Sequence, residues 1–477
     1  MTICCLATLS ARPVRAGDWH TGVGGNSARN SLSDESGPTD PDILWTGSRP
    51  AIVAQQGCSD GNLFVTSRIG SFTIPTGTWI VAQDLTTGNE VWAVQLPFDF
   101  PATSWRSRAS AIRDGHVYAT RAGNTNLDFL YALAAADGSI VWQSEDLIDE
   151  GTTESVAFAA NGDIIAGSFN SLIRIDGLDG TTVWQSPRSC PTSSGCQAAA
   201  FGNRVYIWEA SGAGPVISVF DIKSGAELYS SAGIGGGFIE QLGPFVGPDG
   251  TVYAPRTQNN ALTDFLVAFD DTGAALVERW SVPLGYVPFA SFGIGPDGSV
   301  YSYATDQDGG NADLTIQRLH PANGNVIDTS PILPSNFPVQ PRIAIDATGT
   351  IYLTNGGFSN GGLFSLNADL SLRWSEAIPN VNVGGPVLGQ DGILIVCGIG
   401  NNVRAYQTAV APADMNCDGN IDGLDVQAYL LAVLDPVQYE VDFPDCNVNN
   451  GDLNSDGHVD SGDNAAFAQC LVNGVCP

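Results

Sequence analysis

The C-terminal part of the chain repeats one twelve-residue pattern of oxygen-bearing side chains. The first copy runs from Asp414 to Asp425 and the second from Asp452 to Asp463. In both copies Asp or Asn stands at positions 1, 3, 5, 9 and 12, and Gly stands at position 6. Side chains at positions 1, 3 and 5 converge on one centre, the Gly permits a sharp turn, and position 7 offers its carbonyl. The pattern therefore predicts a hard cation with oxygen ligands, namely calcium.

The pattern is complete twice, and its copies begin 38 residues apart (452 minus 414). A chain rich in Asp and Gly can produce one such loop by chance, so the repetition favours two calcium sites over acidic turns without metal. Apolar residues at helical spacing follow each loop. They are Leu424, Val426, Tyr429, Leu430, Val433 and Leu434 after the first loop, and Ala465, Ala466, Phe467, Cys470 and Leu471 after the second. Each loop is thus predicted to lead into a short helix.

Two loop-then-helix units with Asp at position 12 resemble the type I dockerin domain over residues 412–477. The resemblance implies a small α-helical, EF-hand-like module that binds cohesin domains of extracellular assemblies, often assemblies of polysaccharide-degrading enzymes. It also implies two calcium ions with the ligands Asp414, Asn416, Asp418, Asn420, Asp422 and Asp425 in the first loop, and Asp452, Asn454, Asp456, His458, Asp460 and Asp463 in the second. Of these, Asn420 and His458 would contribute main-chain carbonyls.

The surface that meets a partner departs from that family. Loop positions 10 and 11 are Gly423-Leu424 and Ser461-Gly462, where the family commonly carries matched hydroxyl pairs. We therefore expect a cohesin-like protein or another cell-surface protein as the partner. From Pro412 onward the chain has twelve acidic residues and no Lys or Arg. Because such a module repels itself, we predict that it folds poorly without calcium.

The main body, residues 42–408, is a repeat array. Its unit is a strand, a turn that ends in Gly, and a strand that ends in an aromatic residue, and these residues are Trp92, Trp142, Trp184, Tyr229, Trp280 and Trp374. A second hairpin precedes each unit, with turns such as Asp60-Gly61 and Asp249-Gly250. These turns recur at intervals of 41 to 54 residues. Four strands per repeat at this period indicate an all-β fold, a β-propeller.

The number of blades follows from the ends of the array. There are eight such turns, but the last repeat stops after its third strand, at Tyr406. The isolated segment Ile43–Thr46 carries the same kind of Trp, Trp45. We predict that it supplies the missing fourth strand and closes an eight-bladed ring, which removes the open sheet edges. Seven blades plus a stray N-terminal strand is the alternative.

The Asp/Thr-Gly-x-x-x-Trp unit resembles the pyrroloquinoline-quinone-type repeat of secreted, outer-membrane-assembly-type propellers, over residues 18–408. The resemblance implies that each Trp packs between neighbouring blades, with stacking on a ligand as the alternative. The predicted layout is a signal peptide at 1–16, a lead-in at 17–41, the propeller at 42–408, a linker at 409–413, and the dockerin-like calcium-binding domain at 414–477.

Composition excludes several classes of partner. The net charge is −31 and the chain has one lysine, Lys223, which argues against nucleic acid and against an anionic membrane surface. No apolar run is long enough for a transmembrane segment.

Residues Met1–Ala16 contain a short apolar stretch and a small-residue cleavage site but no N-terminal positive charge, which leaves the start of the leader open. We expect an exported protein, either extracellular or at the periplasm or cell surface.

Ten cysteines fit this expectation. Cys4 and Cys5 would leave with the leader, and eight would remain. The spacing suggests disulfides between Cys190 and Cys196, between Cys470 and Cys476, and between Cys417 and Cys446. The alternative is that all eight are free thiols.

The propeller shows no recognisable catalytic constellation. None of the four histidines, His20, His116, His320 and His458, has a partner arrangement typical of a triad or a metal site. The loop Asp306–Asp313 could hold a cation and the segment Trp105–Arg108 could bind an anion or a sugar, although a plain structural role is the preferred interpretation of both. No quinone is expected, because a quinoprotein dehydrogenase would need a metal, an Asp base and usually adjacent cysteines, and Cys4-Cys5 lies in the leader.

Three functions remain. The leading hypothesis is a secreted, non-catalytic propeller that binds a carbohydrate or protein ligand and is attached to an assembly by its calcium module. The second is a polysaccharide-degrading enzyme or its accessory. The third is a quinone-dependent oxidoreductase.

Overall fold

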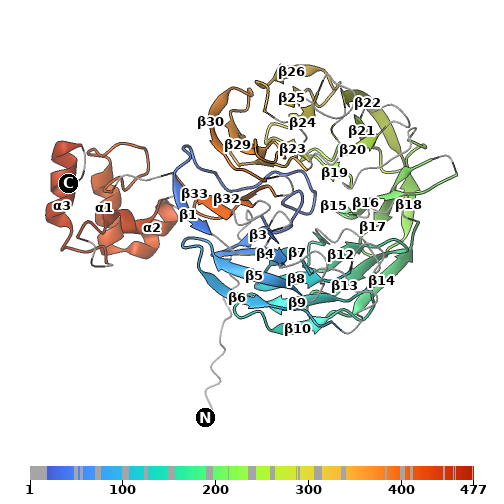
Figure 1. The fold of residues 1–477 in the computed structure, drawn as a ribbon, viewed down its shortest axis with the longest axis horizontal. Helices are drawn as coiled ribbons and strands as arrows, with labels where there is room; N and C mark the ends of the chain where they lie inside the picture. The colour runs from blue at the N-terminus through green and yellow to red at the C-terminus, as the bar shows by residue number, and fades with distance from the viewer. Residues whose placement is uncertain are drawn as a thin grey trace, which may run out of the picture.

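The chain forms a ring of β-sheets and, beside it, a small group of helices (Figure 1). The computed structural model describes residues 19–47, 52–53, 57–69, 77–98, 107–122, 127–148, 156–189, 197–212, 214–234, 243–257, 264–285, 287, 291–305, 314–334, 340–381, 384–397, 403–408, 412–443, 446–454, 456, 458–474 and 476. Over these residues the strands assemble into eight antiparallel sheets, one for each blade. The predicted eight-bladed propeller is confirmed.

Blades 1 to 4 occupy the first half of the ring. Blade 1 contains β2 (Ile52–Val53), β3 (Cys58–Asp60), β4 (Leu63–Ile69), β5 (Thr78–Asp84) and β6 (Glu90–Val94). Blade 2 contains β7 (Arg108–Arg113), β8 (His116–Thr120), β9 (Leu130–Ala134) and β10 (Ile140–Gln143). Blade 3 contains β11 (Ala157–Phe158), β12 (Ile164–Gly167), β13 (Ser171–Ile175) and β14 (Thr182–Pro187). Blade 4 contains β15 (Ala199–Phe201), β16 (Arg204–Glu209), β17 (Val216–Asp221) and β18 (Glu227–Ser230).

Blades 5 to 8 form the second half of the ring. Blade 5 contains β19 (Phe245–Val246), β20 (Val252–Thr257), β21 (Asp264–Asp271) and β22 (Leu276–Gly285). Blade 6 contains β23 (Phe292–Ile294), β24 (Val300–Ala304), β25 (Thr315–Leu319) and β26 (Val326–Thr329). Blade 7 contains β27 (Ile343–Ile345), β28 (Ile351–Thr354), β29 (Gly362–Leu366) and β30 (Leu372–Ala377). Blade 8 contains β31 (Pro386–Leu388), β32 (Leu394–Cys397), β33 (Val403–Tyr406) and the N-terminal strand β1 (Ile43–Gly47).

The ring is closed by the pairing of the first strand with the last. β1 lies antiparallel to β33, with Ile43 opposite Tyr406 and Gly47 opposite Val403. The fourth strand of blade 8 therefore comes from the N-terminus, as predicted. Blade 1 departs from the simple pattern, because β2 and β3 both pair with β4 and so divide the innermost strand into two pieces.

Burial follows the place of a strand within its blade. The innermost strand β27 is buried at every residue, whereas the outermost strand β14 alternates between half-buried and exposed side chains. This period of two is typical of a sheet with one solvated face. The hydrophobic core lies between blades, where, for example, Tyr118 and Trp142 of blade 2 belong to one buried cluster with Phe158 and Ile173 of blade 3.

Five of the seams between blades are built from an indole and a glycine. The indole N–H groups of Trp45, Trp92, Trp142, Trp184 and Trp280 donate to main-chain carbonyls of the next blade, at 2.7 to 3.2 Å. The indoles lie on the turn glycines Gly88, Gly138, Gly180, Gly225 and Gly324, where a Cβ would come within 2.5 to 2.9 Å of the ring. The predicted role of these tryptophans in blade docking is confirmed.

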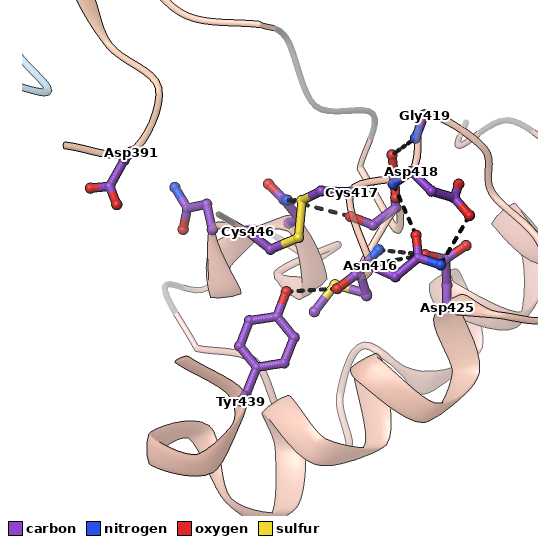
Figure 2. Close-up of a disulfide and its surroundings, with 12 residues drawn as sticks. Asp391, Asn416, Cys417, Asp418, Gly419, Asp425, Tyr439 and Cys446 are labelled. Carbon is purple, nitrogen blue, oxygen red and sulfur yellow. Dashed lines mark hydrogen bonds between the residues drawn. A yellow bond between two sulfur atoms is a disulfide. The ribbon is translucent and has the colours of Figure 1, made fainter. Parts of the chain in front are cut away.

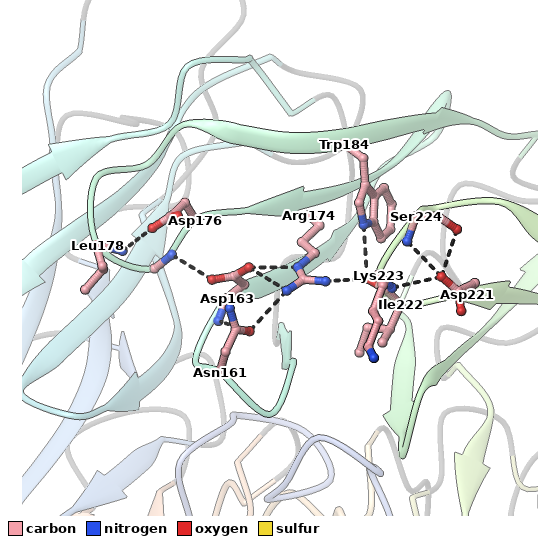
Figure 3. Close-up of polar contacts among 11 residues, drawn as sticks. Asn161, Asp163, Arg174, Asp176, Leu178, Trp184, Asp221, Ile222, Lys223 and Ser224 are labelled. Carbon is pink, nitrogen blue, oxygen red and sulfur yellow. Dashed lines mark hydrogen bonds and ion pairs between the residues drawn. The ribbon is translucent and has the colours of Figure 1, made fainter.

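Polar side chains reinforce the seams and replace the indole where it is missing. Between blades 3 and 4, Arg174 is paired with Asp163 at 2.7 Å and donates to the carbonyl of Ile222, which also accepts from Trp184 (Figure 3). Between blades 4 and 5, Tyr229 stands in place of the Trp, and its hydroxyl donates to Asp271 at 2.6 Å. This seam therefore keeps a hydrogen bond between blades without an indole, because the Asp271 carboxylate accepts from Tyr229.

The lead-in runs inside the ring, a course that the sequence did not indicate. Residues Trp19 to Ser31 make a hydrogen bond with the innermost strand of every blade, at 2.7 to 3.2 Å. These bonds involve Ser59, Ile112, Phe158, Ala200, Val246, Ile294, Ile345 and Leu388 in blades 1 to 8. A short segment that reaches all eight innermost strands must lie around the ring axis. The lead-in therefore ties the blades together from within.

The indole–glycine seam predicts different costs for two glycine substitutions. Gly138→Ala would place a Cβ 2.7 Å from the Trp92 ring, whereas Gly115→Ala, at a similar positive φ, would meet nothing within 4 Å. Both carry the left-handed strain of about 1–2 kcal/mol, and Gly138→Ala adds an overpacking cost of about 1–3 kcal/mol. We expect thermal unfolding of the Gly138→Ala variant at a clearly lower midpoint. Equal midpoints for the two variants would contradict this account of the seam.

Candidate metal centre

The two acidic loops each lead into a helix, as predicted. Helix α1 (Asp425–Leu434) begins at the last residue of the first loop, and α3 (Asn464–Asn473) follows the last residue of the second. Between them lie α2 (Pro436–Asp442) and the short 3-10 helix η2 (Val448–Gly451). Neither of these was predicted. Asp435 caps α2 by accepting the main-chain N–H of Gln438 at 3.1 Å.

The carboxylate at position 12 organises the first loop. Asp425 Oδ1 accepts the N–H groups of Met415 and Asn416, at 2.7 and 3.1 Å, and its Oδ2 accepts the N–H of Asp422 at 2.8 Å. Position 1 does the same across the turn, since Asp414 Oδ2 accepts the N–H of Gly419 at 2.9 Å. Figure 2 shows Asn416, Gly419 and Asp425 together in this loop. The loop is therefore held closed around its own acidic side chains.

The second loop repeats the arrangement. Asp463 Oδ1 accepts the N–H groups of Leu453 and Asn454, at 2.8 and 3.0 Å, and Oδ2 accepts that of Asp460 at 3.0 Å. Asn454 Oδ1 accepts the N–H of Asp456 at 2.9 Å, just as Asn416 Oδ1 accepts that of Asp418 at 3.0 Å. The side chains at positions 3 and 12 thus make the same bonds in both loops, although His458 and Ser461 stand where the first loop has Asn420 and Gly423. The twelve-residue pattern, rather than the intervening residues, determines the loop conformation.

Negative charge is buried in both loops without a basic side chain nearby in the sequence. Asp414, Asp425 and Asp463 are at most 2% exposed, and the stretch from Pro412 onward has no Lys or Arg. Asp414 Oδ1 is buried and has no hydrogen-bond partner. Burial raises the pKa of the Asp414 carboxyl, and the charges of Asp425 and Asp418 raise it further. A buried carboxylate with an oxygen that lacks a partner is costly unless a cation offsets its charge.

These residues fit a calcium ion. Asp414 Oδ1 offers an unused acceptor, and the other five predicted ligands of the first site lie on the same loop. Within the described residues, no group of three His, Cys, Asp or Glu side chains is placed to hold a metal by itself. The predicted sites also draw on Asn side chains and main-chain carbonyls, which are hard oxygen ligands of the kind that Ca²⁺ takes. Calcium binding by the twelve residues remains a prediction.

An aromatic pair joins the two loop-and-helix units. Tyr429 on α1 stacks on Phe467 on α3, with ring centroids 3.9 Å apart. The Tyr429 hydroxyl also donates toward the carbonyl of Asp460 and the side chain of Asn464, at 3.1 and 2.9 Å. Each aromatic lies four residues after its position-12 Asp, which is the signal that could have revealed the pair. The geometry of the second loop is therefore tied to the first helix.

Two predicted disulfides are confirmed. Cys417 is bonded to Cys446, which ties the first loop to the segment after α2 (Figure 2), and Cys470 is bonded to Cys476. Cys58 and Cys397 are free and buried, in blades 1 and 8. The proposed pair of Cys190 and Cys196 lies outside the described residues. The alternative of eight free thiols is therefore wrong.

Only some of the candidate site residues of the propeller lie within the described part of the chain. The loop Asp306–Asp313 and the residues Trp105 and Arg106 lie outside the described part of the chain, and Arg108 begins β7 half-buried. His20 is on the lead-in, its ring 5.6 Å from that of Phe158, and His320 accepts the N–H of Ala322 at 3.2 Å. No helix among the described residues has the length and apolar character to span a membrane.

Closed four-stranded blades, indole–glycine seams and the repeat period together define a β-propeller of the pyrroloquinoline-quinone-repeat class. The family model described as outer membrane protein assembly factor BamB matches residues 76–330, and the chain belongs to this family. No curated protein matches the sequence.

Solved structures share the ring. A europium-containing methanol dehydrogenase aligns with a TM-score of 0.54 at 12% identity, over 80% of this chain and 89% of that one. The quinohemoprotein alcohol dehydrogenase of Comamonas testosteroni aligns with 0.56 at 12% identity, over 83% and 81%. The quinohemoprotein alcohol dehydrogenase ADHIIG of Pseudomonas putida HK5 aligns with 0.53 at 12% identity, over 82% and 80%. At such identities the likeness concerns the fold.

The loop geometry predicts the calcium stoichiometry of a single-residue variant. Asp414→Asn removes a buried charge from the first loop, whereas Asp442→Asn changes an exposed residue outside both loops. We expect equilibrium dialysis of the full chain to give two calcium ions for the wild type and for Asp442→Asn, and one ion for Asp414→Asn. Two ions bound by Asp414→Asn at wild-type affinity would contradict the ligand assignment.

The disulfides predict a second difference. Removing the Cys417–Cys446 disulfide, which spans 29 residues, should destabilise the fold by about 3–4 kcal/mol in the loop-closure model, because the unfolded chain gains entropy. The same model gives about 2 kcal/mol for Cys470–Cys476, which spans 6 residues. Because the longer link anchors the first loop, the Cys417→Ser/Cys446→Ser variant should lose calcium affinity at that loop. Calorimetric titration should show the smaller loss for Cys470→Ser/Cys476→Ser, and the reverse order would refute the anchoring role.

Proposed function

We propose that this chain is an exported, non-catalytic scaffold. Its propeller binds a protein or carbohydrate ligand, and its C-terminal module attaches the propeller, with calcium, to an extracellular or cell-surface assembly. One observation carries the proposal: two loops of different sequence form the same hydrogen-bond pattern around buried carboxylates, with no Lys or Arg in the module. Such loops need a cation to be stable, and a module that calcium completes is suited to reversible attachment.

Three features support export. The Cys417–Cys446 and Cys470–Cys476 disulfides are typical of an oxidising compartment outside the cytosol. The matched family is described as an outer membrane assembly factor, a role stated for that protein. Calcium sites of this kind also suit the millimolar calcium found outside cells.

The ring supports a binding role for the propeller. Its blades are locked by indole seams on the outside and by the lead-in on the inside, which makes it a rigid platform. Loops on a rigid scaffold are favourable places for recognition. The ligand class, whether protein or carbohydrate, is part of the proposal.

A quinone-dependent oxidoreductase is the second candidate. It is favoured by the fold shared with two quinohemoprotein alcohol dehydrogenases. Against it, the lead-in occupies the ring axis beside all eight innermost strands, and the sequence has no adjacent cysteines after Cys5. A quinone absorbance band in the purified protein, or one that appears on adding the quinone with calcium, would establish this candidate and displace the scaffold.

The docking role predicts calcium-dependent capture. Immobilised full chain should retain a cell-surface protein in calcium and release it in chelator, because the loops lose their shape without the ion. The Asp418→Ala/Asp456→Ala variant should fail to retain it, and mass spectrometry identifies the retained proteins. The matched control, Asp137→Ala/Asp179→Ala, makes the same charge change on exposed propeller turns and should behave as wild type. Retention of the same proteins by the loop variant would show that the module does not dock.

A further inference from the structure

The calcium module carries a row of exposed aliphatic side chains that no described part of the chain covers. Leu430 and Leu434 on α1 are 49% and 78% exposed, and Val437 and Val441 on α2 are 72% and 66% exposed. Residues four apart share one face of a helix, so each helix contributes a pair. Leu434 and Val437 are separated only by Asp435 and Pro436, where α1 gives way to α2. We call these four residues the aliphatic ridge.

The ridge is not a by-product of the module's core. On the opposite side of the same helices, Ala428, Tyr429, Ala432 and Tyr439 are fully buried in the module's hydrophobic cluster. The exposures are those of the whole described chain, so the propeller does not shield the ridge. Single exposed aliphatics are ordinary, whereas a contiguous group with a polar border marks an interaction site.

The ridge occurs once, although the calcium loops occur twice. Helix α2 follows the first loop-and-helix unit, and α3 of the second unit exposes one large aliphatic, Val472. The pseudo-symmetry of the two loops is therefore broken at the surface. A partner that contacts the ridge therefore binds the module in one orientation.

Charge decides which kind of partner fits. Asp435 and Asp442 border the ridge and are exposed, and the module from Pro412 onward has twelve acidic residues against no Lys or Arg. A second copy of the chain would bring two surfaces of the same sign together, which is unfavourable. A partner surface with an aliphatic groove and basic residues along its edge would bury the ridge and also attract the acidic residues that border it.

We propose that the aliphatic ridge is the docking surface of the module and that its partner is a protein with an aliphatic groove flanked by Lys or Arg. This inference rests on the proposed docking function and specifies where and what the module binds. Recognition then depends on aliphatic contacts of α1 and α2 rather than on side-chain hydroxyls at loop positions 10 and 11, where the first loop has Gly423 and Leu424.

The test is site-specific photocrosslinking of the full chain to cell-envelope proteins of the source organism, in calcium. A photoreactive residue replaces Val437 in the ridge or, as the control, Val472 on α3, which is 86% exposed. We expect crosslinking from position 437 alone, onto a peptide with aliphatic and basic residues. Capture should fall about tenfold or more in the Leu434→Ser/Val441→Ser variant, while two calcium ions remain bound. Capture should also weaken at high salt.

Each contrary result has a separate meaning. Equal crosslinking from positions 437 and 472, or full capture by Leu434→Ser/Val441→Ser, overturns the ridge and leaves the docking function standing. Crosslinks to a second copy of the chain, or to a peptide without basic residues, overturn the choice of partner. Absence of calcium-dependent capture by the wild type overturns the docking function and the ridge with it.

Discussion

The propeller depends on one contact, the packing of an indole from one blade on a turn glycine of the next. The contact explains why Gly must stand in these turns, since a Cβ would come within 2.5 to 2.9 Å of the ring in five seams. It also explains why the core lies between blades rather than within them. A blade alone would leave both faces of its sheet in water, so the stable unit is the closed ring.

The sequence predicted the elements that recur and the strand that closes the ring, and it missed other elements that occur once. The repeated Gly and Trp positions indicated eight blades, and Trp45 indicated the strand that closes them. The course of the lead-in has no period and depends on bonds to strands hundreds of residues away. Helix α2 is only seven residues long, too short for a periodic signal. In blade 7, Leu370 adopts a positive φ of 65° where other blades use Gly, which no turn rule anticipates.

The sequence also predicted the two acidic loops and the helices that follow them, because the spacing of the Asp, Asn and Gly residues is a local feature. The internal bonds of the loops were not predicted, since the sequence does not show that Asp425 and Asp463 also accept three main-chain N–H groups each. The two parts of the molecule thus reach stability by different means. The propeller buries a large apolar core, whereas the module buries carboxylates around a small one.

The pairing of β1 with β33 joins residues at opposite ends of the propeller, Ile43 and Tyr406. During synthesis, the first strand emerges long before the three strands that it completes. Until then β1 has no sheet to join, blade 8 does not exist, and an open array would expose two edges to other chains. Contacts of such high sequence separation form slowly, so the closing of the ring is expected to be a late step in folding. Its architecture thus makes the completion of blade 8 a single late closing event.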